Sequence, residues 1–177
     1  MLMNSDSIST TVNFSPADLQ IVQADYANLD HAAARVSLLD AYARDPAGGG
    51  EGLGEFAKSN LVAALAARPQ AFSVLALDGG TPIGLVNCIK GFSTFACKPL
   101  VNVHDVAVLS AYRGQRVAEH MLALAEDIAR QRGACKLTLE VLQGNAGAIR
   151  LYERIGFAAY ALDPAMGSAQ FFQKWLD

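Results

Sequence analysis

The chain has 177 residues, of which 52% are hydrophobic and 18% are charged, with a formal net charge of −3. This length suits one domain with a full hydrophobic core, and the composition excludes a disordered chain. Without a basic block, nucleic acid and an anionic membrane are disfavoured as main partners, and no apolar run approaches the roughly 18–20 residues that span a bilayer.

The three cysteines and three histidines are scattered. The cysteines are odd in number and show no CxxC spacing, so neither a disulfide framework nor a metal site is expected, and a reducing cytoplasm is the default location. Residues 1–16 are polar and lack the features of a secretory signal. We expect a flexible N-terminal tail over 1–16 and a single domain over 17–177.

Hydrophobic periodicity and turn signals predict the elements in chain order. Asn28 or Asp30 can cap the first helix, Gly-rich residues 45–54 form a loop, and Gly133 ends the long helix. The expected elements are a strand at 19–24, helices at 30–44 and 55–68, a hairpin of strands at 71–77 and 83–92, a strand at 103–108, a helix from about 117 to 132, a strand at 136–142, a helix at 146–155, and strands at 157–161 and 170–175.

The element order β-α-α-β-β-β-α-β-α-β-β predicts a mixed α/β fold, with about six or seven strands and helices on both faces of the sheet. The strand at 103–108 and the strand at 136–142 flank a helix and form a βαβ unit. Ligands of such sheets bind at the carboxyl ends of the parallel strands. We therefore expect the site near 108–118 and 142–145.

Residues 102–122 carry the clearest binding signal. A strand leads through Arg113 and Gly114 into a helix whose apolar positions are Val117, Met121, Ala125 and Ile128. The unpaired N–H groups and the dipole of such a helix start favour a phosphate. An ordinary βα connection, in which the glycine serves only the turn, explains the same pattern.

Two stretches resemble the GNAT family of N-acetyltransferases. Residues 105–122, DVAVLSAYRGQRVAEHML, are similar to its acyl-CoA-binding motif, Arg/Gln-x-x-Gly-x-Gly/Ala after a strand, and residues 139–157, LEVLQGNAGAIRLYERIGF, are similar to its second motif. Residues 91–108 are more loosely similar to the spermidine/spermine-type branch, which usually carries an acidic pair where this chain has His104 and Asp105. The resemblance implies the GNAT fold and acetyl-CoA as co-substrate, with no metal.

The resemblance also implies the residues that contact the coenzyme. They are the backbone of the strand and of the following loop, together with Asn145 and Ala148 of the second motif: Val106, Ala107, Val108, Arg113, Gly114, Gln115, Arg116, Val117, Ala118, Asn145 and Ala148. Arg116 stands where the family usually has a glycine. We expect Arg116 to donate its backbone N–H as a helical residue and to favour the diphosphate by its charge. If instead the diphosphate must approach the backbone so closely that a side chain does not fit, Arg116 would weaken coenzyme binding. Asn145 could instead serve only as an N-cap.

The family's reaction needs a proton acceptor for the amine and a proton donor for the departing thiolate. Tyr152 is the candidate acid, and its alternative role is packing in the apolar stripe of Ala148, Leu151 and Ile155. His104 is the candidate base, with Glu140 or a water relay as alternatives, and a hydrogen-bonded core histidine is the structural alternative. Strict strand alternation would place His104 and Val106 on one face and Asp105 on the other.

The leading hypothesis is an acetyl-CoA-dependent N-acetyltransferase that acts on a primary amine of a small molecule. Alternatives are a protein N-acetyltransferase and an acyl-CoA-binding sensor without turnover, and a dinucleotide-binding domain is disfavoured because no GxGxxG follows a strand. The acceptor is expected between the first two helices and the hairpin at 92–99, near Tyr26, Tyr42, Asp45 and Glu51. The aromatic C-terminal strand could pair with a second copy in a homodimer, or could complete the core.

Overall fold

The computed structural model describes residues 16–176 except 162, 164, 166 and 168. The predicted tail over 1–16 therefore lies almost entirely outside the described residues. The elements are β1 (Leu19–Gln23), α1 (Leu29–Ala43), η1 (Pro46–Gly48), α2 (Glu55–Ala66), β2 (Ala71–Asp78), β3 (Thr81–Ser93), β4 (Lys98–Val108), η2 (Ser110–Tyr112), α3 (Val117–Gln131), β5 (Leu137–Leu139) and α4 (Ala146–Arg154).

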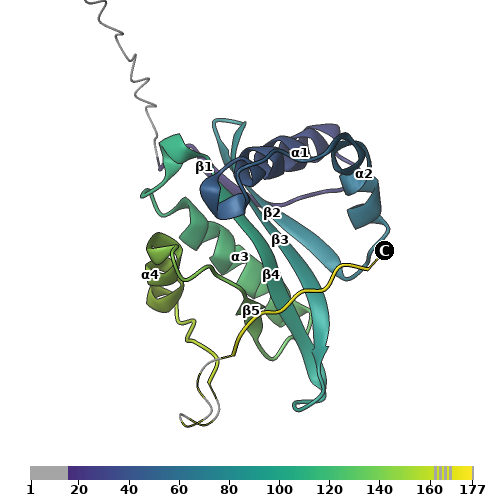
Figure 1. Ribbon diagram of the computed structural model, residues 1–177. Helices are drawn as coiled ribbons and strands as arrows, with labels where there is room; N and C mark the ends of the chain where they lie inside the picture. The colour runs from purple at the N-terminus through teal and green to yellow at the C-terminus, as the bar shows by residue number, and fades with distance from the viewer. Residues whose placement is uncertain (1–15, 162, 164, 166, 168, 177) are drawn as a thin grey trace, which may run out of the picture.

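The sheet has the order β1-β2-β3-β4-β5 (Figure 1). The pairs β1–β2, β2–β3 and β3–β4 are antiparallel, and β5 pairs parallel to β4 after the α3 crossover. This arrangement confirms the mixed α/β fold, the hairpin and the βαβ unit that the sequence predicts.

The two faces of the sheet carry separate cores. On one face Val74 and Val86 pack with Met121 and Ala125 of α3, whereas the opposite face buries Leu75 and Leu85 against α1. Strand alternation explains this division, because successive side chains of β2 and β3 point to opposite faces. Most side chains of these central strands are fully buried, as a sheet covered on both faces requires.

Local signals fix the helix boundaries close to their predicted positions. The side chain of Asn28 accepts hydrogen bonds from the N–H groups of Asp30 and His31 at 2.9 and 3.1 Å, which confirms it as the N-cap of α1. Gly133 follows α3 with φ +75°, and its N–H bonds the Arg130 carbonyl at 2.9 Å.

The predicted strand count is too high: the described residues form five strands, and those of 157–161 and 170–175 form none. Gly156, with φ +97°, ends α4, and the Phe157 N–H bonds back to the Tyr152 carbonyl at 2.9 Å. Phe157 then packs against the Tyr152 ring, so the chain turns toward α4 and does not extend along β5. Alternating apolar residues do not make a strand where no ladder partner is supplied.

Strands β4 and β5 also differ in length from the prediction. The hairpin turn occupies only residues 94–97, so β4 begins at Lys98 and not at residue 103. In contrast, β5 ends at Leu139, three residues before its predicted end, although Val141 continues the alternating pattern. In the described part of the chain, no helix is both long and apolar enough to cross a membrane.

Candidate active site

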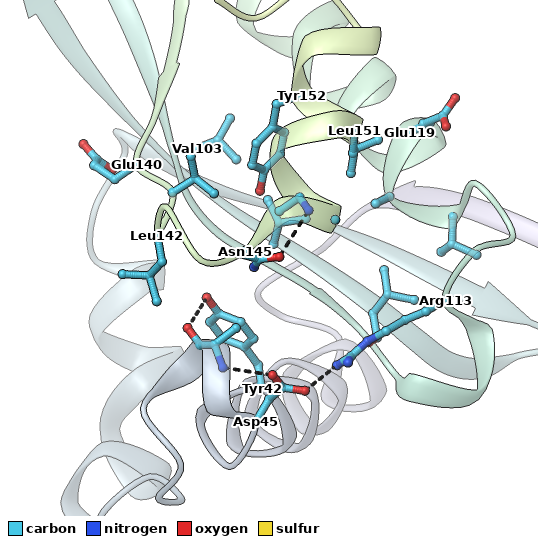
Figure 2. Close-up of a pocket in the computed structure, with 18 of the residues that line it drawn as sticks. Tyr42, Asp45, Val103, Arg113, Glu119, Glu140, Leu142, Asn145, Leu151 and Tyr152 are labelled. Atoms are coloured by element: carbon cyan, nitrogen blue, oxygen red, sulfur yellow. Dashed lines mark hydrogen bonds and ion pairs between the residues drawn. The ribbon is translucent and has the colours of Figure 1, made fainter. Parts of the chain in front are cut away.

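A cavity of about 910 Å³ lies at the carboxyl end of β4 (Figure 2). Its walls come from β4, the start of α3, the segment after β5, α4 and the end of α1. The predicted site residues that line it are His104, Val106, Val108, Arg113, Gly114, Arg116, Val117, Ala118, Glu140, Asn145, Ala148 and Tyr152.

Two predicted coenzyme-binding residues are not among the residues that line the cavity. Ala107 is buried with Leu85 on the face that α1 covers. Gln115 turns its side-chain amide back to the Ala111 carbonyl at 3.2 Å. The resemblance implies contacts through the backbone of these two residues, which the positions of their side chains do not test, so these contacts stay predictions.

The loop between β4 and α3 presents a run of free backbone donors. Within the described residues, no internal acceptor is recorded for the N–H groups of residues 114–119. The first N–H groups of a helix lack intrahelical partners, and Gly114, with φ +76°, extends the run toward β4. Together with the positive end of the α3 dipole, these donors have the chemistry that favours an anion.

Arg116 is the N-cap of α3 and has a left-handed conformation, with φ 61° and ψ 13°. The expectation that it is an ordinary helical residue is therefore wrong. The left-handed region explains why a glycine is suited to this position, because a Cβ costs roughly 1–2 kcal/mol there. Arg116 nevertheless leaves its N–H without an internal acceptor, as the prediction required.

Arg113 is held by neighbouring groups of the protein. Its guanidinium bonds the Val108 carbonyl through Nε at 3.0 Å and the Asp45 carboxylate through Nη2 at 2.8 Å. The N–H of Ala47, and after it Arg113, keep the pKa of Asp45 below its usual value. Arg113 therefore links the end of β4 to the segment after α1, and half of its side chain remains exposed.

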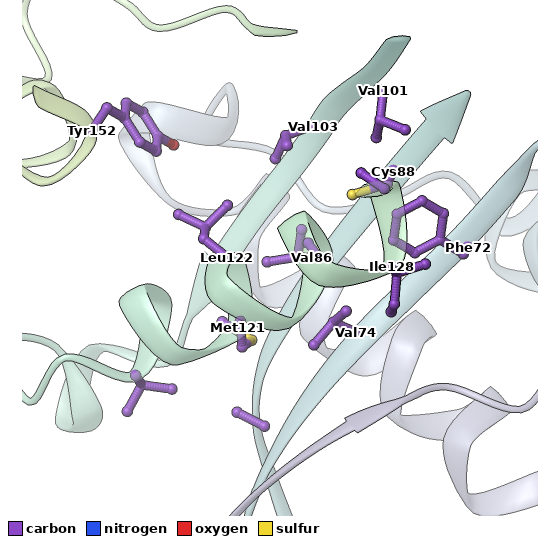
Figure 3. Packing of buried hydrophobic residues seen from close by; sticks show 14 of the residues in the cluster. Phe72, Val74, Val86, Cys88, Val101, Val103, Met121, Leu122, Ile128 and Tyr152 are labelled. Carbon is purple, nitrogen blue, oxygen red and sulfur yellow. The ribbon is translucent and has the colours of Figure 1, made fainter. Parts of the chain in front are cut away.

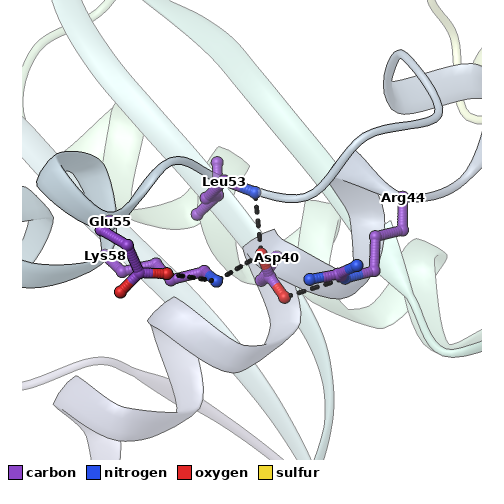
Figure 4. A network of polar contacts seen from close by, with 5 residues as sticks. All are labelled: Asp40, Arg44, Leu53, Glu55 and Lys58. Atoms are coloured by element: carbon purple, nitrogen blue, oxygen red, sulfur yellow. Dashed lines mark hydrogen bonds and ion pairs between the residues drawn. The ribbon is translucent and has the colours of Figure 1, made fainter.

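A polar network around Asp40 holds the rest of that segment (Figure 4). Asp40 accepts from the Leu53 N–H at 2.8 Å and from Arg44 Nε at 3.1 Å, and Lys58 of α2 lies 3.7 Å away. These contacts join α1, the loop and the start of α2. They place Tyr42 and Asp45 on the cavity wall.

Strands β4 and β5 separate at the cavity. Their pairing ends with Val103 and Leu139, so the rest of β4 has no β5 partner. The Leu109 N–H bonds the Ile83 carbonyl of β3 at 2.9 Å. Because the backbone groups of successive residues alternate in direction, those of Ala107 also face β3. Those of Val106 and Val108 therefore face the open side. Arg113 occupies the Val108 carbonyl, which leaves the N–H and C=O of Val106 facing the gap.

A β-bulge at His104 changes the facing of β4. Asn87 of β3 is opposite Asp105, and Cys88 is opposite Val103, so His104 is the extra residue. The expectation that His104 shares a face with Val106 is therefore wrong: Val103 and Val106 both pack toward α3. Strict alternation fails here because the bulge shifts the register by one residue.

His104 is exposed at the cavity, which contradicts the alternative of a core histidine. Its Nδ1 lies 3.2 Å from Oδ1 of Asn102. The Asn102 amide in turn lies 3.2 and 3.3 Å from the two carboxylate oxygens of Glu140. The two candidate bases are thus connected through a single amide that sequence reasoning missed.

Tyr152 packs in the core, as one alternative predicted, and also reaches the cavity; its role as an acid stays a prediction. Its ring is buried against the α3-side core (Figure 3). The ring centroid lies 5.9 Å from that of the Phe157 ring. Its hydroxyl points into the cavity (Figure 2). Burial, and to a lesser degree Tyr42, raises the pKa of Tyr152 to about 12, so the hydroxyl keeps its proton at neutral pH.

Asn145 is the N-cap of α4, where its side chain accepts from the Ala148 N–H at 3.2 Å. The capping role is therefore confirmed, and the residue also lines the cavity. Its amide group is directed toward the opening in Figure 2. A contact with a ligand stays a prediction.

Of the four predicted acceptor residues, Tyr42 and Asp45 line the cavity. Tyr26 packs against the buried Arg35 guanidinium at 4.0 Å, and Glu51 lies on the exposed loop. The structure adds lining residues that the sequence did not predict as site residues: Ala47, Val103, Tyr112, Glu119, Val141, Leu142, Gly147, Leu151, Arg154 and Phe171. Of these, Phe171 lies far along the chain from the motifs, and no local signal marks it.

Charges on the cavity wall are mostly paired. Arg154 bonds Glu119, and Arg113 bonds Asp45. Among the described lining residues, Arg116 and Glu140 are the charged side chains that have no ion-pair partner. No group of three or more His, Cys, Asp or Glu that could hold a metal occurs among the residues described.

The protein is thus an α/β protein with free amides at a strand–loop–helix junction, beside a strand whose parallel neighbour has separated, which is an arrangement that suits an anionic ligand. The model of the acetyltransferase (GNAT) family matches residues 33–157, and the chain belongs to this family.

Curated relatives match about half of this chain. The streptothricin acetyltransferase of Streptomyces lavendulae is 41% identical over 87 residues, which cover 48% of this chain and 46% of that protein. The N-alpha-acetyltransferase 30 of Schizosaccharomyces pombe is 31% identical over 98 residues, covering 50% of this chain and 59% of its own. The chain thus spans about half the length of these relatives.

Solved structures share the fold over most of the chain. A probable acetyltransferase superposes with a TM-score of 0.74 at 24% identity, covering 89% of this chain and 99% of its own. An aminoglycoside acetyltransferase from an uncultured soil metagenomic sample, in complex with trehalose, superposes with a TM-score of 0.73 at 14% identity, covering 91% and 99%. At these identities the likeness concerns the fold alone.

The left-handed Arg116 leads to a stability prediction. Arg116→Gly should raise the free energy of unfolding by about 1 kcal/mol, because it removes a Cβ from a left-handed position. Arg116→Ala is the matched control: it removes the same cation but keeps the Cβ, and should change stability by less than about 0.5 kcal/mol. Urea unfolding of both variants measures the difference, and equal stabilities would contradict the strain at this position.

Proposed function

We propose that this protein is an acetyl-CoA-dependent N-acetyltransferase that acetylates a primary amine of a small molecule. The observation that carries the proposal is the run of unpaired N–H groups at residues 114–119, beside the open backbone of Val106. Such donors suit a diphosphate, and the strand edge suits an amide-containing arm. The names of two relatives, streptothricin acetyltransferase and aminoalkylphosphonate N-acetyltransferase, support a small acceptor.

The unpaired charges of the cavity support the same arrangement. Arg116 stands at the loop that would hold the diphosphate, and Glu140 stands beyond the end of β5, next to the His104 and Asn102 pair. A cation at one end favours the coenzyme, and a carboxylate at the other favours an ammonium group. The amine would therefore enter from the side of Glu140 and His104.

The roles of His104 and Tyr152 follow from their protonation. An amine with an intrinsic pKa near 10 must lose a proton before it attacks the thioester carbonyl, and the exposed imidazole of His104 is the proposed acceptor. Bond formation between the nitrogen and the acetyl carbon releases the thiolate, to which the Tyr152 hydroxyl donates its proton. The Val106 N–H, which has no β5 partner, would bind the oxygen that gains charge.

One specific observation favours each of two other functions of the same site. The likeness to an N-alpha-acetyltransferase favours a protein N-terminus as the acceptor. A coenzyme-binding sensor without turnover is favoured by Arg116, which places a strained cation where the family usually has a glycine. Binding and turnover separate these functions from the leading proposal.

The proposed function is tested by titrating acetyl-CoA and then measuring thiol release. Micromolar binding by calorimetry and thiol release with a small polyamine, aminoglycoside or amino acid are expected. Release only with peptides would favour the protein acceptor, and binding without release would favour the sensor. No heat and no thermal shift with millimolar coenzyme would overturn all three.

The acid role predicts the kinetics of Tyr152→Phe. Its kcat should fall about 100-fold, because the thiolate loses its proton donor. Tyr160→Phe is the matched control, since Tyr160 is an exposed tyrosine outside the cavity wall, and its rate should change less than threefold. If turnover of Tyr152→Phe matches the wild type up to pH 10, Tyr152 takes no part in proton transfer.

The same residue predicts how stability depends on alkaline pH. Because folding raises the pKa of Tyr152 to about 12, its contribution is complete below the unfolded value near 10 and is lost as the pH rises toward 12. Tyr152→Phe should lack this component of the loss, which urea unfolding between pH 9 and 11.5 can measure. An identical pH dependence in both proteins would contradict the raised pKa.

We also propose a homodimer in a reducing, cytoplasmic compartment. The three cysteines are free thiols, and the described C-terminal residues expose four large apolar side chains: Phe171, Phe172, Trp175 and Leu176. A surface of this kind is typical of an interface. Sedimentation equilibrium should show a dimer at micromolar concentration and a monomer for the double variant Phe172→Ser and Trp175→Ser, whereas a monomeric wild type would contradict the proposal.

A further inference from the structure

We propose that Asn102 is a positioning residue that holds the His104 ring in the tautomer with the proton on Nδ1. Glu140 anchors Asn102 in this role. The catalytic importance of this tautomer rests on the proposed function, because His104 needs a ring nitrogen without a proton only if it acts as a base. It adds a residue that the sequence motifs do not single out.

The orientation of the Asn102 amide follows from Glu140. A carboxylate accepts hydrogen bonds and does not donate them, so the amide nitrogen must face the two Glu140 oxygens, at 3.2 and 3.3 Å. The same nitrogen also lies 3.4 Å from the Thr138 hydroxyl. The carbonyl oxygen Oδ1 is then left on the side of His104.

The tautomer of His104 follows from that orientation. Oδ1 of Asn102 lies 3.2 Å from His104 Nδ1, and an amide oxygen only accepts. Nδ1 must therefore carry the proton, and in the neutral ring Nε2 carries the lone pair. Nε2 is thereby fixed as the nitrogen that accepts a proton from the amine. The other tautomer, which would present an Nε2–H to the substrate, is disfavoured.

The fold brings these residues together at the point where β4 and β5 separate. Asn102 is paired in register with Thr138, one step before the last pair, and Glu140 immediately follows β5 on the same side as Thr138. The bulge adds His104 to the strand without a β3 partner and leaves its ring nitrogen beside Asn102. Alternation puts Asn102 and His104 on the same face of β4, opposite Val103.

The test is the tautomer itself, read from the nitrogen chemical shifts of the full-length, coenzyme-free protein with labelled histidine. The spectra are recorded at a pH where the ring is neutral, and His104→Ala assigns the signal among the three histidines. The wild type should show the Nδ1–H form as the major species. A major Nε2–H form would overturn the proposal.

Variants separate positioning from packing. Asn102→Ala and Glu140→Ala should each yield a mixture of tautomers, whereas Asn102→Asp should keep Nδ1–H, because a carboxylate also accepts from it. Thr138→Ala is the matched control: it removes the other neighbour of the same amide, does not contact His104, and should leave the spectrum unchanged. An unchanged tautomer in Asn102→Ala would overturn the role of Asn102.

Kinetics distinguish this inference from the proposed function. Asn102→Ala should lower kcat severalfold with little change in the KM for the coenzyme, and His104→Ala should lower kcat/KM at least tenfold at pH 7. If the tautomer shifts in Asn102→Ala while His104→Ala keeps full activity, Asn102 positions the ring but His104 is not the base. The structural inference would then stand and the base assignment would fail.

Discussion

The site depends on hydrogen bonds that β4 does not make. A buried backbone N–H or C=O must find a partner, and a central strand normally finds one on each side. Here β5 pairs with β4 only as far as Val103 and Leu139, so Val106 has a free N–H and C=O at the edge of the cavity. The sheet is complete on the β3 side, and this rigid support holds the open edge in place for a ligand that pairs with it.

Two backbone irregularities determine where the His104 side chain and the first amides of α3 lie around that edge. The bulge at His104 returns Val106 to the face of Val103, so that both valines pack in the core while His104 lies beside Asn102 on the other face. The left-handed Arg116 starts α3 so that its first amides face the same cavity. Strained or irregular positions concentrate at functional sites because the surrounding packing can support their cost.

Much of the site could be predicted from the sequence, because its donors belong to contiguous motifs. Strand, Gly114 and helix are encoded locally, and so are the capping by Asn145 and the stripe that carries Tyr152. What could not be predicted depends on register or on distant segments. The link from His104 through Asn102 to Glu140 crosses two strands, and its signal, a polar residue paired with Thr138, has meaning only once the parallel register is known.

Composition and periodicity by themselves determined a mixed sheet with helices on both faces and the order of its elements, because burial of apolar faces at periods of 2 and 3.6 residues is a local property of the chain. Only the tertiary structure decided that residues 157–161 and 170–175 are not strands, that β5 ends at Leu139 and that β4 bulges at His104. These outcomes depend on whether a neighbouring strand supplies hydrogen bonds, and no segment carries that information alone.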